Sequence, residues 1–430
     1  MSSEDGMQVS TPPLPFDLRF RLSIMMFLEF AIWGAWFVVF FDYLLILKFN
    51  GTQAGIIFGN MALGAIISPM LVGLLADRWI ASEKLMALLH LAGAGLLYWM
   101  SSIHSADYTQ FMIASLAYAL VFNPTLSLAN SISFSHIPDG TRDFPGIRVL
   151  GTIGWIAANL YVGMYLDFKS NQPLQLAAGL SLVAGLFSLL LPHTPPSGKK
   201  GDPLPFLSAL KLFKEPGFAI FFTVSGAITI VLAFYYSNTA SFLTQLKADM
   251  VPESWRFYFL SDSQGKQLIN PNNTMLIGQL MEMILLPLLP LFLWRFGMKW
   301  VLVIGMLCWG IRYGLFALGE PFWVVLIGVA LHGICFDFFF AAGFIHVDNT
   351  APKEIRASGQ ALFAFLTYGL GMWLGSILSG VMNKQFTTEG VGTDWTKFWL
   401  VPSIGVMALV LIFTFLFHSK TSVESHHDSE

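Results

Sequence analysis

Apolar runs long enough to cross the hydrocarbon core of a bilayer as helices of about 20 residues recur along the whole of this chain. Twelve can be delimited, at residues 21–47, 55–76, 84–104, 109–135, 146–167, 174–192, 216–244, 274–294, 299–318, 321–348, 355–381 and 396–417. Lipid provides no water for exposed backbone groups, so each run is predicted to form a helix. The runs are continuous, whereas a membrane β-barrel needs short alternating strands.

Composition supports an all-α polytopic membrane protein. Charged residues make up 11% of the chain, against about 25% in ordinary soluble domains. Residues 1–20 are polar and acidic and lack the basic start and cleavage site of a secretory signal, so we expect the first span to be retained. Cys308 and Cys335 both fall inside spans, which argues against a disulfide framework or a zinc site.

Basic residues predict the orientation. With a cytoplasmic N-terminus, the inner segments hold fifteen of the 23 Lys and Arg residues and the outer segments hold seven. This excess predicts that both termini are cytoplasmic. The tail at 418–430 is polar and is expected to be disordered.

The spans divide into two groups of six. Residues 193–215 concentrate Pro, Gly and Lys and predict a cytoplasmic linker between an N-terminal half, 21–192, and a C-terminal half, 216–417. The halves resemble each other: Arg78 and Arg295 occupy equivalent loops, and Ile147-Arg148 corresponds to Ile355-Arg356. Repeated halves around a midplane site are a common transporter design, so a central site between the halves is expected.

The span at 274–294 carries Gln279 and Glu282 near its middle, three residues apart and therefore on one helical face. A carboxylate at the centre of a bilayer costs about 2.5 kcal/mol or more and usually marks a substrate or proton path. The alternative is a polar contact between helices, worth about 1 kcal/mol or less. The high cost of a carboxylate favours function.

A second polar face lies in the fifth span. Arg148, Thr152 and Trp155 stand at i, i+4 and i+7, which places a guanidinium, a hydroxyl and an indole on one side of a helix. They are candidate substrate contacts. The alternative is that Arg148 extends to the cytoplasmic headgroups; against it, Asp143 and Pro145 start the helix early and place Arg148 roughly a turn inside.

Two further carboxylates lie within spans. Asp337 stands among phenylalanines, and burial there favours its neutral form, as a proton-coupling residue requires. Alternatively, Asp337 pairs with Arg312 or Arg148 and holds helices together. Glu29, with Trp33 on its face, is either a second proton site or the partner of a buried cation.

Several blocks carry a family resemblance. They are Trp33-Gly34-Ala35-Trp36, the segment from Asp143 to Gly154, Gln279-Leu280-Met281-Glu282, Gly333-Ile334-Cys335-Phe336-Asp337-Phe338-Phe339 and Arg356-Ala357-Ser358. In this order and spacing they resemble the bacterial nucleoside:proton symporters over nearly the full chain. Gly73-Leu74-Leu75-Ala76-Asp77-Arg78 also resembles the loop motif of the major facilitator superfamily, with the later basic residues of that motif replaced.

The resemblance implies a major facilitator fold and nucleoside contacts around His332 and Phe336. The family places Tyr where His332 stands, and Gln and Asn where this chain has Ala233 and Tyr236. Tyr236 can still stack and form one hydrogen bond, whereas Ala233 can do neither. These departures leave the preferred nucleoside open.

We therefore expect a monomeric twelve-helix symporter in the inner membrane that imports nucleosides with protons by alternating access. Substrate contacts are expected from Arg148, Thr152, Trp155, Tyr236, Gln279, Glu282, His332 and Phe336, and proton coupling from Asp337, Glu282 and Glu29. No cofactor, metal, nucleic acid or enzymatic activity is expected, and no phosphate-binding Gly-rich loop indicates ATP use. The alternatives are a symporter for a saccharide or a similar hydroxylated solute, and a membrane receptor without flux.

Overall fold

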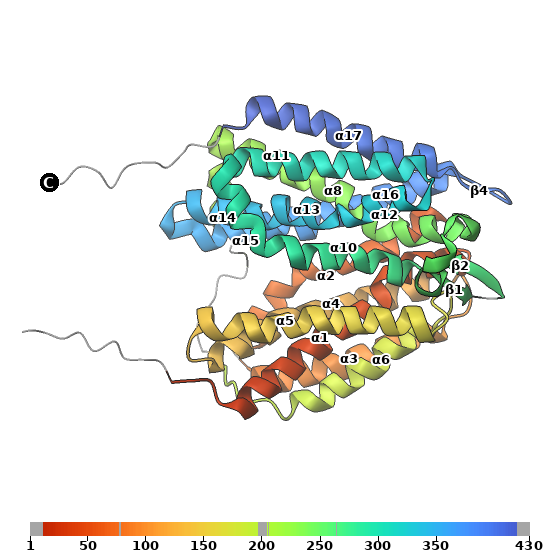
Figure 1. Cartoon of the computed structure of the whole chain (residues 1–430). Coiled ribbons are helices and arrows are strands. Elements are labelled where there is room, and N and C mark those ends of the chain that lie inside the picture. Colours follow the sequence, from red (N-terminus) through yellow and green to blue (C-terminus); the bar gives the residue numbers. More distant parts are fainter. Residues whose placement is uncertain (1–11, 77–78, 197–203, 205, 264, 419–430) are drawn as a thin grey trace, which may run out of the picture. The chain divides into compact units, whose positions relative to one another are not determined.

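The computed structural model describes residues 12–76, 79–196, 204, 206–263 and 265–418, and Figure 1 shows that almost all of this chain is helical. Contacts divide it into two compact units. Unit 1 lies within Met1–Lys48 and Leu63–Pro203, and unit 2 within Phe49–Ala62 and Leu204–Glu430. Several predicted features lie outside the described residues: Asp77 and Arg78 of the loop motif, Lys199 and Lys200 of the linker, the first eleven residues and most of the tail.

Unit 1 is built from long apolar helices: α1 (Phe16–Ile46), the second part of α2 (Gly51–Leu75), α3 (Ser82–Ser102), α4 (Tyr108–His136), α5 (Gly140–Tyr165) and α6 (Gln172–Ser188). Helix α4 begins at Asp107, whose carboxylate accepts a hydrogen bond from the Gln110 backbone N–H. Helix α1 packs closely against α5. The absence of a side chain at Gly154 permits this, since a Cβ there would meet the Phe27 backbone. One cluster of the core joins Met26, Leu128 and Ile147.

Unit 2 includes the first part of α2, within Phe49–Ala62, and continues with short segments and one long helix: α7 (Phe206–Ala209), η1 (Leu210–Lys214), α8 (Pro216–Gln245), η2 (Ala248–Met250), η3 (Glu253–Trp255) and α9 (Arg256–Phe259). Unit 2 also contains two short hairpins, β1 (Leu260–Ser263) with β2 (Lys266–Ile269) and β3 (Thr387–Thr388) with β4 (Gly392–Thr393). Both are antiparallel and lie at the same end of unit 2 in Figure 1.

The remaining helices of unit 2 are interrupted. They are α10 (Pro271–Leu285), η4 (Leu286–Leu288), α11 (Leu289–Leu318), α12 (Phe322–Ala330), α13 (His332–Phe336), η5 (Asp337–Ala341), α14 (Ala342–Thr350), η6 (Lys353–Ile355), α15 (Arg356–Ala364), η7 (Phe365–Gly371), α16 (Met372–Phe386) and α17 (Trp395–Leu416). Segments η5 and η7 are π-helical. Such segments occur often at functional sites.

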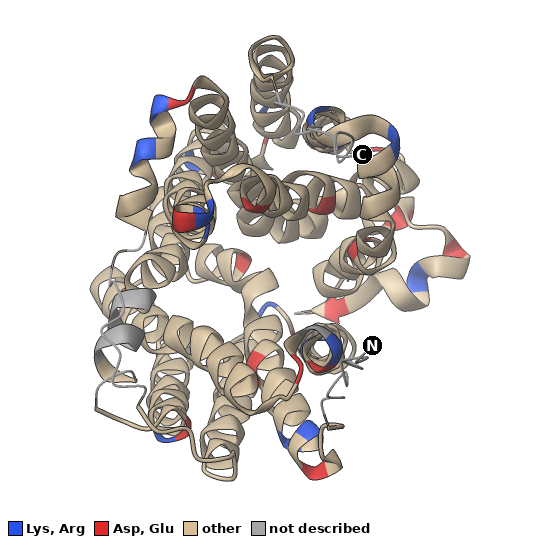
Figure 2. Ribbon diagram, turned by 90° about the vertical axis from the view of Figure 1, so that its left-hand side faces the viewer, with Lys and Arg blue, Asp and Glu red and all other residues tan. Residues whose placement is uncertain are grey.

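Ten described helices are long and apolar enough to cross a membrane, and Figure 2 shows few charged residues along them. One of them, Pro271–Leu318, has 48 residues, whereas the hydrocarbon core needs about 20. Gly297, with φ +74°, interrupts it and divides it into two possible crossings. Helix α6 is shorter, at 17 residues. The helical membrane class is confirmed, and twelve crossings remain a prediction.

Candidate functional site

Two glycines bring α10 and α13 together in unit 2. A Cβ at Gly278 would lie 2.9 Å from the Cβ of His332, and one at Gly333 would lie 2.6 Å from the Met281 carbonyl carbon. Only glycine permits so close an approach of the two backbones. As a result, Glu282 Oε2 on α10 lies 4.0 Å from His332 Nε2 on α13.

The His332 cluster contains several of the residues that the sequence predicted as substrate contacts. The imidazole is fully buried and stacks on Tyr235, with ring centroids 5.0 Å apart. Tyr236 approaches it edge-on, and its hydroxyl lies 3.5 Å from Nε2. Phe336 lies one turn further along the chain, 5.7 Å from the imidazole. The cluster therefore combines a carboxylate, an imidazole, a phenol and an aromatic ring, while Gln279 lies one turn before Glu282 on α10.

Arg312 on α11 completes the His332 cluster, and the sequence did not identify it as a site residue. Its side chain is fully buried, and its Cζ lies 3.4 Å from the Tyr235 ring centroid. Its Nη1 lies 3.0 Å from His332 Nδ1. A lone arginine within an apolar span was the available signal, but it had been considered only as a partner for Asp337. Among the ion pairs of the described residues, none joins Arg312 to Asp337.

Asp337 is the first residue of the π-helical segment η5 and is 1% exposed. Its Oδ2 has no hydrogen-bond partner among the described residues. An unsatisfied buried carboxylate oxygen is costly when it is charged. Asp337 is therefore a buried carboxyl group within a membrane-spanning segment, and its predicted role in proton coupling stays a prediction.

Ala233 of α8 packs against α16. It is fully buried, and its Cβ would lie 2.7 Å from a Cβ placed on Gly375 of α16. The small side chain thus permits close packing of α8 against α16. The effect of Ala233 on nucleoside preference stays a prediction, and Tyr236 lies beside His332.

In unit 1, the predicted polar face of α5 is turned toward α1. The Arg148 guanidinium lies over the Phe30 ring, with Cζ 4.1 Å from its centroid. Trp155 packs edge-on against Trp33 at 5.5 Å. Thr152 lies between them on α5 and is half-buried. The three side chains thus share one face, and Arg148 is held beside an aromatic ring of α1.

Glu29 is the centre of a buried network between three helices of unit 1. Its Oε2 lies 2.9 Å from His90 Nε2 on α3, and its Oε1 accepts a hydrogen bond of 2.6 Å from Thr125 Oγ1 on α4. All three side chains are buried. His90 is therefore the group that Glu29 contacts, and both predicted roles of Glu29, a second proton site or the partner of a buried cation, stay predictions. In the sequence, a single histidine in an apolar span was only a weak signal for this contact with Glu29.

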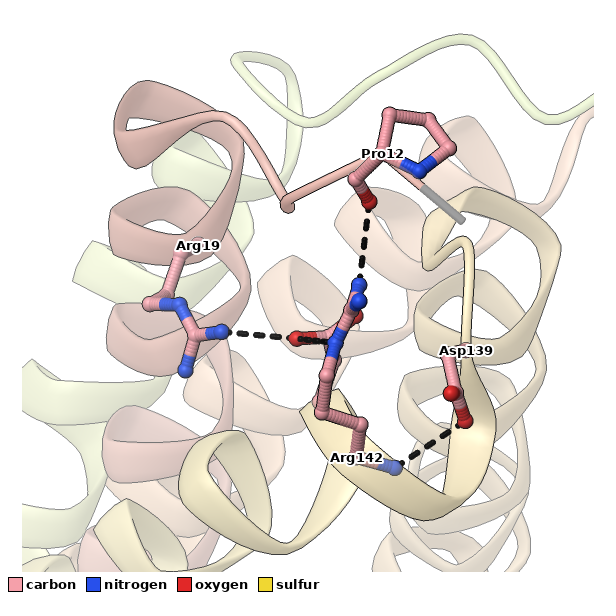
Figure 3. Close-up of polar contacts among 5 residues, drawn as sticks. Pro12, Arg19, Asp139 and Arg142 are labelled. Atoms are coloured by element: carbon pink, nitrogen blue, oxygen red, sulfur yellow. Dashed lines mark hydrogen bonds and ion pairs between the residues drawn. The ribbon is translucent and has the colours of Figure 1, made fainter. Parts of the chain in front are cut away.

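A charged cluster, shown in Figure 3, fixes the starts of α1 and α5. The buried carboxylate of Asp143 accepts from Arg19 Nη2 and from Arg142 Nη2, each at 2.8 Å. Arg142 Nη2 also donates to the Pro12 carbonyl at 3.0 Å. Asp139 accepts from the Arg142 backbone N–H at the start of α5. These contacts fix the register in which Arg148 meets α1.

Comparison with known proteins supports the architecture. A family model described as nucleoside H⁺ symporter matches residues 16–422. The xanthosine permease of Escherichia coli strain K12 is 34% identical over 427 residues, covering 96% of this chain and 97% of the permease. The nucleoside permease NupG of the same strain is 32% identical over 415 residues, covering 93% and 95%.

A solved structure shows the same fold. The crystal structure of the nucleoside transporter NupG matches with a TM-score of 0.84 and 31% identity, and the match covers 94% of this chain and 100% of the NupG chain. The similarity confirms the predicted all-α polytopic class with the major facilitator fold.

Proposed function

This chain belongs to the nucleoside H⁺ symporter family, and from that premise we propose that it imports nucleosides together with protons across the cytoplasmic membrane. It is a multi-pass membrane transporter and not an enzyme. The names of its relatives refer to nucleosides, and nucleosides are the substrates that we propose for this chain.

The His332 cluster is the observation that supports this function most directly. A nucleoside presents a flat base, hydrogen-bonding base edges and ribose hydroxyls. Phe336 and Tyr236 offer aromatic faces, and the Glu282 carboxylate can accept from hydroxyl or N–H groups. Gln279 can both donate and accept beside Glu282. The cluster thus matches each part of such a ligand.

In unit 1, we propose that Arg148, Thr152 and Trp155 also contact the substrate. Arg148 and Thr152 supply donors for ribose or base oxygens, and Trp155 supplies a ring for stacking. The contact of Arg148 with Phe30 holds the guanidinium beside α1. This geometry favours binding over an extension to the lipid headgroups.

Proton coupling is proposed for Asp337, with Glu282 and Glu29 as further carboxylates on the proton path. Asp337 is buried with an unpaired carboxylate oxygen among the described residues. Binding a proton removes the cost of that charge, and the membrane potential supplies about 2.3 kcal/mol per charge per 100 mV. Uptake of a neutral nucleoside with a proton would therefore be driven by both the pH gradient and the potential.

We further propose that the transporter is a monomer with both termini in the cytoplasm. The excess of Lys and Arg in the predicted inner segments supports this orientation.

Uptake into proteoliposomes tests the proposed function. Labelled uridine and adenosine should accumulate when the lumen is made alkaline relative to the outside, and unlabelled nucleoside should compete while excess saccharide should not. Collapse of the proton gradient should stop accumulation. A membrane receptor would bind nucleosides without flux, and a saccharide symporter would show the opposite competition. Either result would exclude proton-driven nucleoside import.

A further inference from the structure

In the contact between Arg312 and His332, chemistry decides which side chain donates the hydrogen bond. Arg312 Nη1 lies 3.0 Å from His332 Nδ1, and both side chains are fully buried. Every guanidinium nitrogen carries hydrogen and shares the delocalised positive charge, so none accepts a hydrogen bond. Nη1 is therefore the donor, and His332 Nδ1 must be the acceptor.

An acceptor Nδ1 carries no hydrogen. In a neutral imidazole the hydrogen then resides on Nε2. Protonation of Nδ1 would remove its hydrogen bond and place a second positive charge beside a guanidinium that is already stacked on Tyr235. The imidazolium form is thus disfavoured by the contact itself.

We propose that Arg312 is a positioning residue for nucleoside recognition, which holds His332 as the neutral Nε2–H tautomer. His332 then presents one hydrogen-bond donor, and no acceptor, toward Glu282 and Tyr236. The substrate atom that meets Nε2 must be an acceptor, such as a carbonyl or hydroxyl oxygen or an unprotonated ring nitrogen. This last step depends on the proposed nucleoside function, whereas the tautomer does not.

Other ionisable groups surround His332, and their positions agree with this assignment. They are Tyr235 and Tyr236 on α8, Glu282 on α10 and Arg312 on α11. Glu282 is the acidic group near the ring, at 4.0 Å from Nε2. Arg312 is closer, and it contacts the other nitrogen directly. The carboxylate therefore orients the Nε2–H bond, while the guanidinium opposes a second proton.

The assignment limits where the coupled proton can reside in the His332 cluster. If Nδ1 is blocked by Arg312, His332 cannot take up a proton during the transport cycle. Proton binding in unit 2 then belongs to carboxylates. His332 is consequently a residue for recognition, and Arg312 acts through it without touching the substrate.

Nuclear magnetic resonance on the wild-type protein tests the tautomer directly. The full chain, labelled with ¹⁵N-histidine and reconstituted in lipid, would be compared with H332Q to identify the His332 ring signals. We expect an unprotonated Nδ1 and a protonated Nε2 at every pH from about 5.5 to 8, a range that spans the ordinary titration of imidazole. A hydrogen on Nδ1, or an imidazolium that forms within this range, would overturn the proposal.

Binding measurements test the consequence for recognition. Uridine affinity would be measured by exchange with equal pH on both sides for wild type, R312Q and the exposed control R295Q. In R312Q the positive charge that opposes a second proton on His332 is removed, so uridine affinity should fall by a larger factor between pH 7.5 and 5.5 than it does in wild type. R295Q should follow wild type.

The double variant R312Q/H332Q separates this effect from titration of the carboxylates. The additional pH dependence expected for R312Q should be absent from the double variant, because the imidazole ring is absent. Persistence of that dependence would contradict a role through His332. Absence of any nucleoside binding in wild type would instead reject the proposed function and leave the tautomer to be decided by the resonance experiment.

Discussion

A buried acidic side chain can act as a proton carrier only if its charge state changes during the cycle. Asp337 meets the structural condition, since it is 1% exposed and its Oδ2 has no hydrogen-bond partner in the described chain. We expect D337N to retain nucleoside exchange and to lose accumulation driven by a pH gradient, because Asn cannot bind the proton. Both activities are measured in proteoliposomes, with the exposed D262N as the control. Unchanged accumulation would exclude Asp337 as the coupling residue.

Glu282 lies close enough to His332 for both to meet one ligand. We expect E282Q to weaken uridine binding by roughly tenfold or more, because a hydrogen bond to a charged group contributes about 1.5–3 kcal/mol. Affinity measured by competition in exchange assays checks this. Wild-type affinity in E282Q would remove Glu282 from the substrate site and leave it a place in the proton path only.

Individual candidate residues could be selected from the sequence where a polar group interrupts an apolar run. Glu282, Asp337 and Glu29 were identified in this way, because their cost in lipid requires an explanation. Arg312 was considered only as a partner of Asp337 and His90 was given no role, since their contacts lie on other helices and spacing along the chain does not reveal them. The contact of Ala233 with α16 was not predictable for the same reason, because it is a property of helix packing.

At the scale of elements, one network ties α1, α3 and α4 through Glu29, His90 and Thr125. H90L would leave Glu29 Oε2 buried without its partner, and we expect a loss of about 1–3 kcal/mol in unfolding free energy. Thermal unfolding in detergent measures this, with the exposed H104L as the control. The double variant E29L/H90L should lose less than the sum of the two single variants. Strict additivity would show that the two side chains do not interact.

The close approach of α10 and α13 depends on glycine. A methyl group at Gly333 would overlap the backbone of Met281 and Glu282, and overpacking of this kind costs about 1–3 kcal/mol. We expect G333A to lower both the unfolding temperature and uridine affinity, because it separates Glu282 from His332. Gly95 of α3 has no atom within 4 Å of an added Cβ, so G95A is the matched control. Equal behaviour of the two variants would refute this packing role.

Helical elements were predictable because hydropathy reports them directly, and each predicted span coincides with helical segments. The interruptions were less accessible. The π-helical segments η5 and η7 have no signature in the hydropathy, and the sequence around Asp337 shows only an apolar run. The break at Gly297 is an exception, since a glycine with positive φ lies between two predicted spans.

At the scale of the whole molecule, the linker predicted the division of the chain, but contacts also assign Phe49–Ala62 to unit 2. Side chains at Gly51 or Gly55 of α2 would meet the Gly380 backbone of α16. Such packing of small residues has no hydropathy signature. The sequence therefore predicted two halves without revealing that α2 contributes to both units.

The proposed orientation can be tested on intact cells. After replacement of Cys308 and Cys335 by alanine, a cysteine at the exposed Lys266 of β2 should react with a membrane-impermeant maleimide. One at the exposed Lys211 of η1 should react only after the membrane is permeabilised. The reason is that the positive-inside pattern places the linker in the cytoplasm. Reversal of the two labelling patterns would contradict the proposed topology.

The turn at Gly297 has a consequence for how the protein enters the membrane. Glu282 and Arg312 each lie fifteen residues from Gly297 along the chain, which is about 22 Å of helix on either side. A helical hairpin closed at this glycine brings an acidic and a basic side chain to the same depth. Inserted as one piece, the hairpin transfers no net charge from these two residues into lipid.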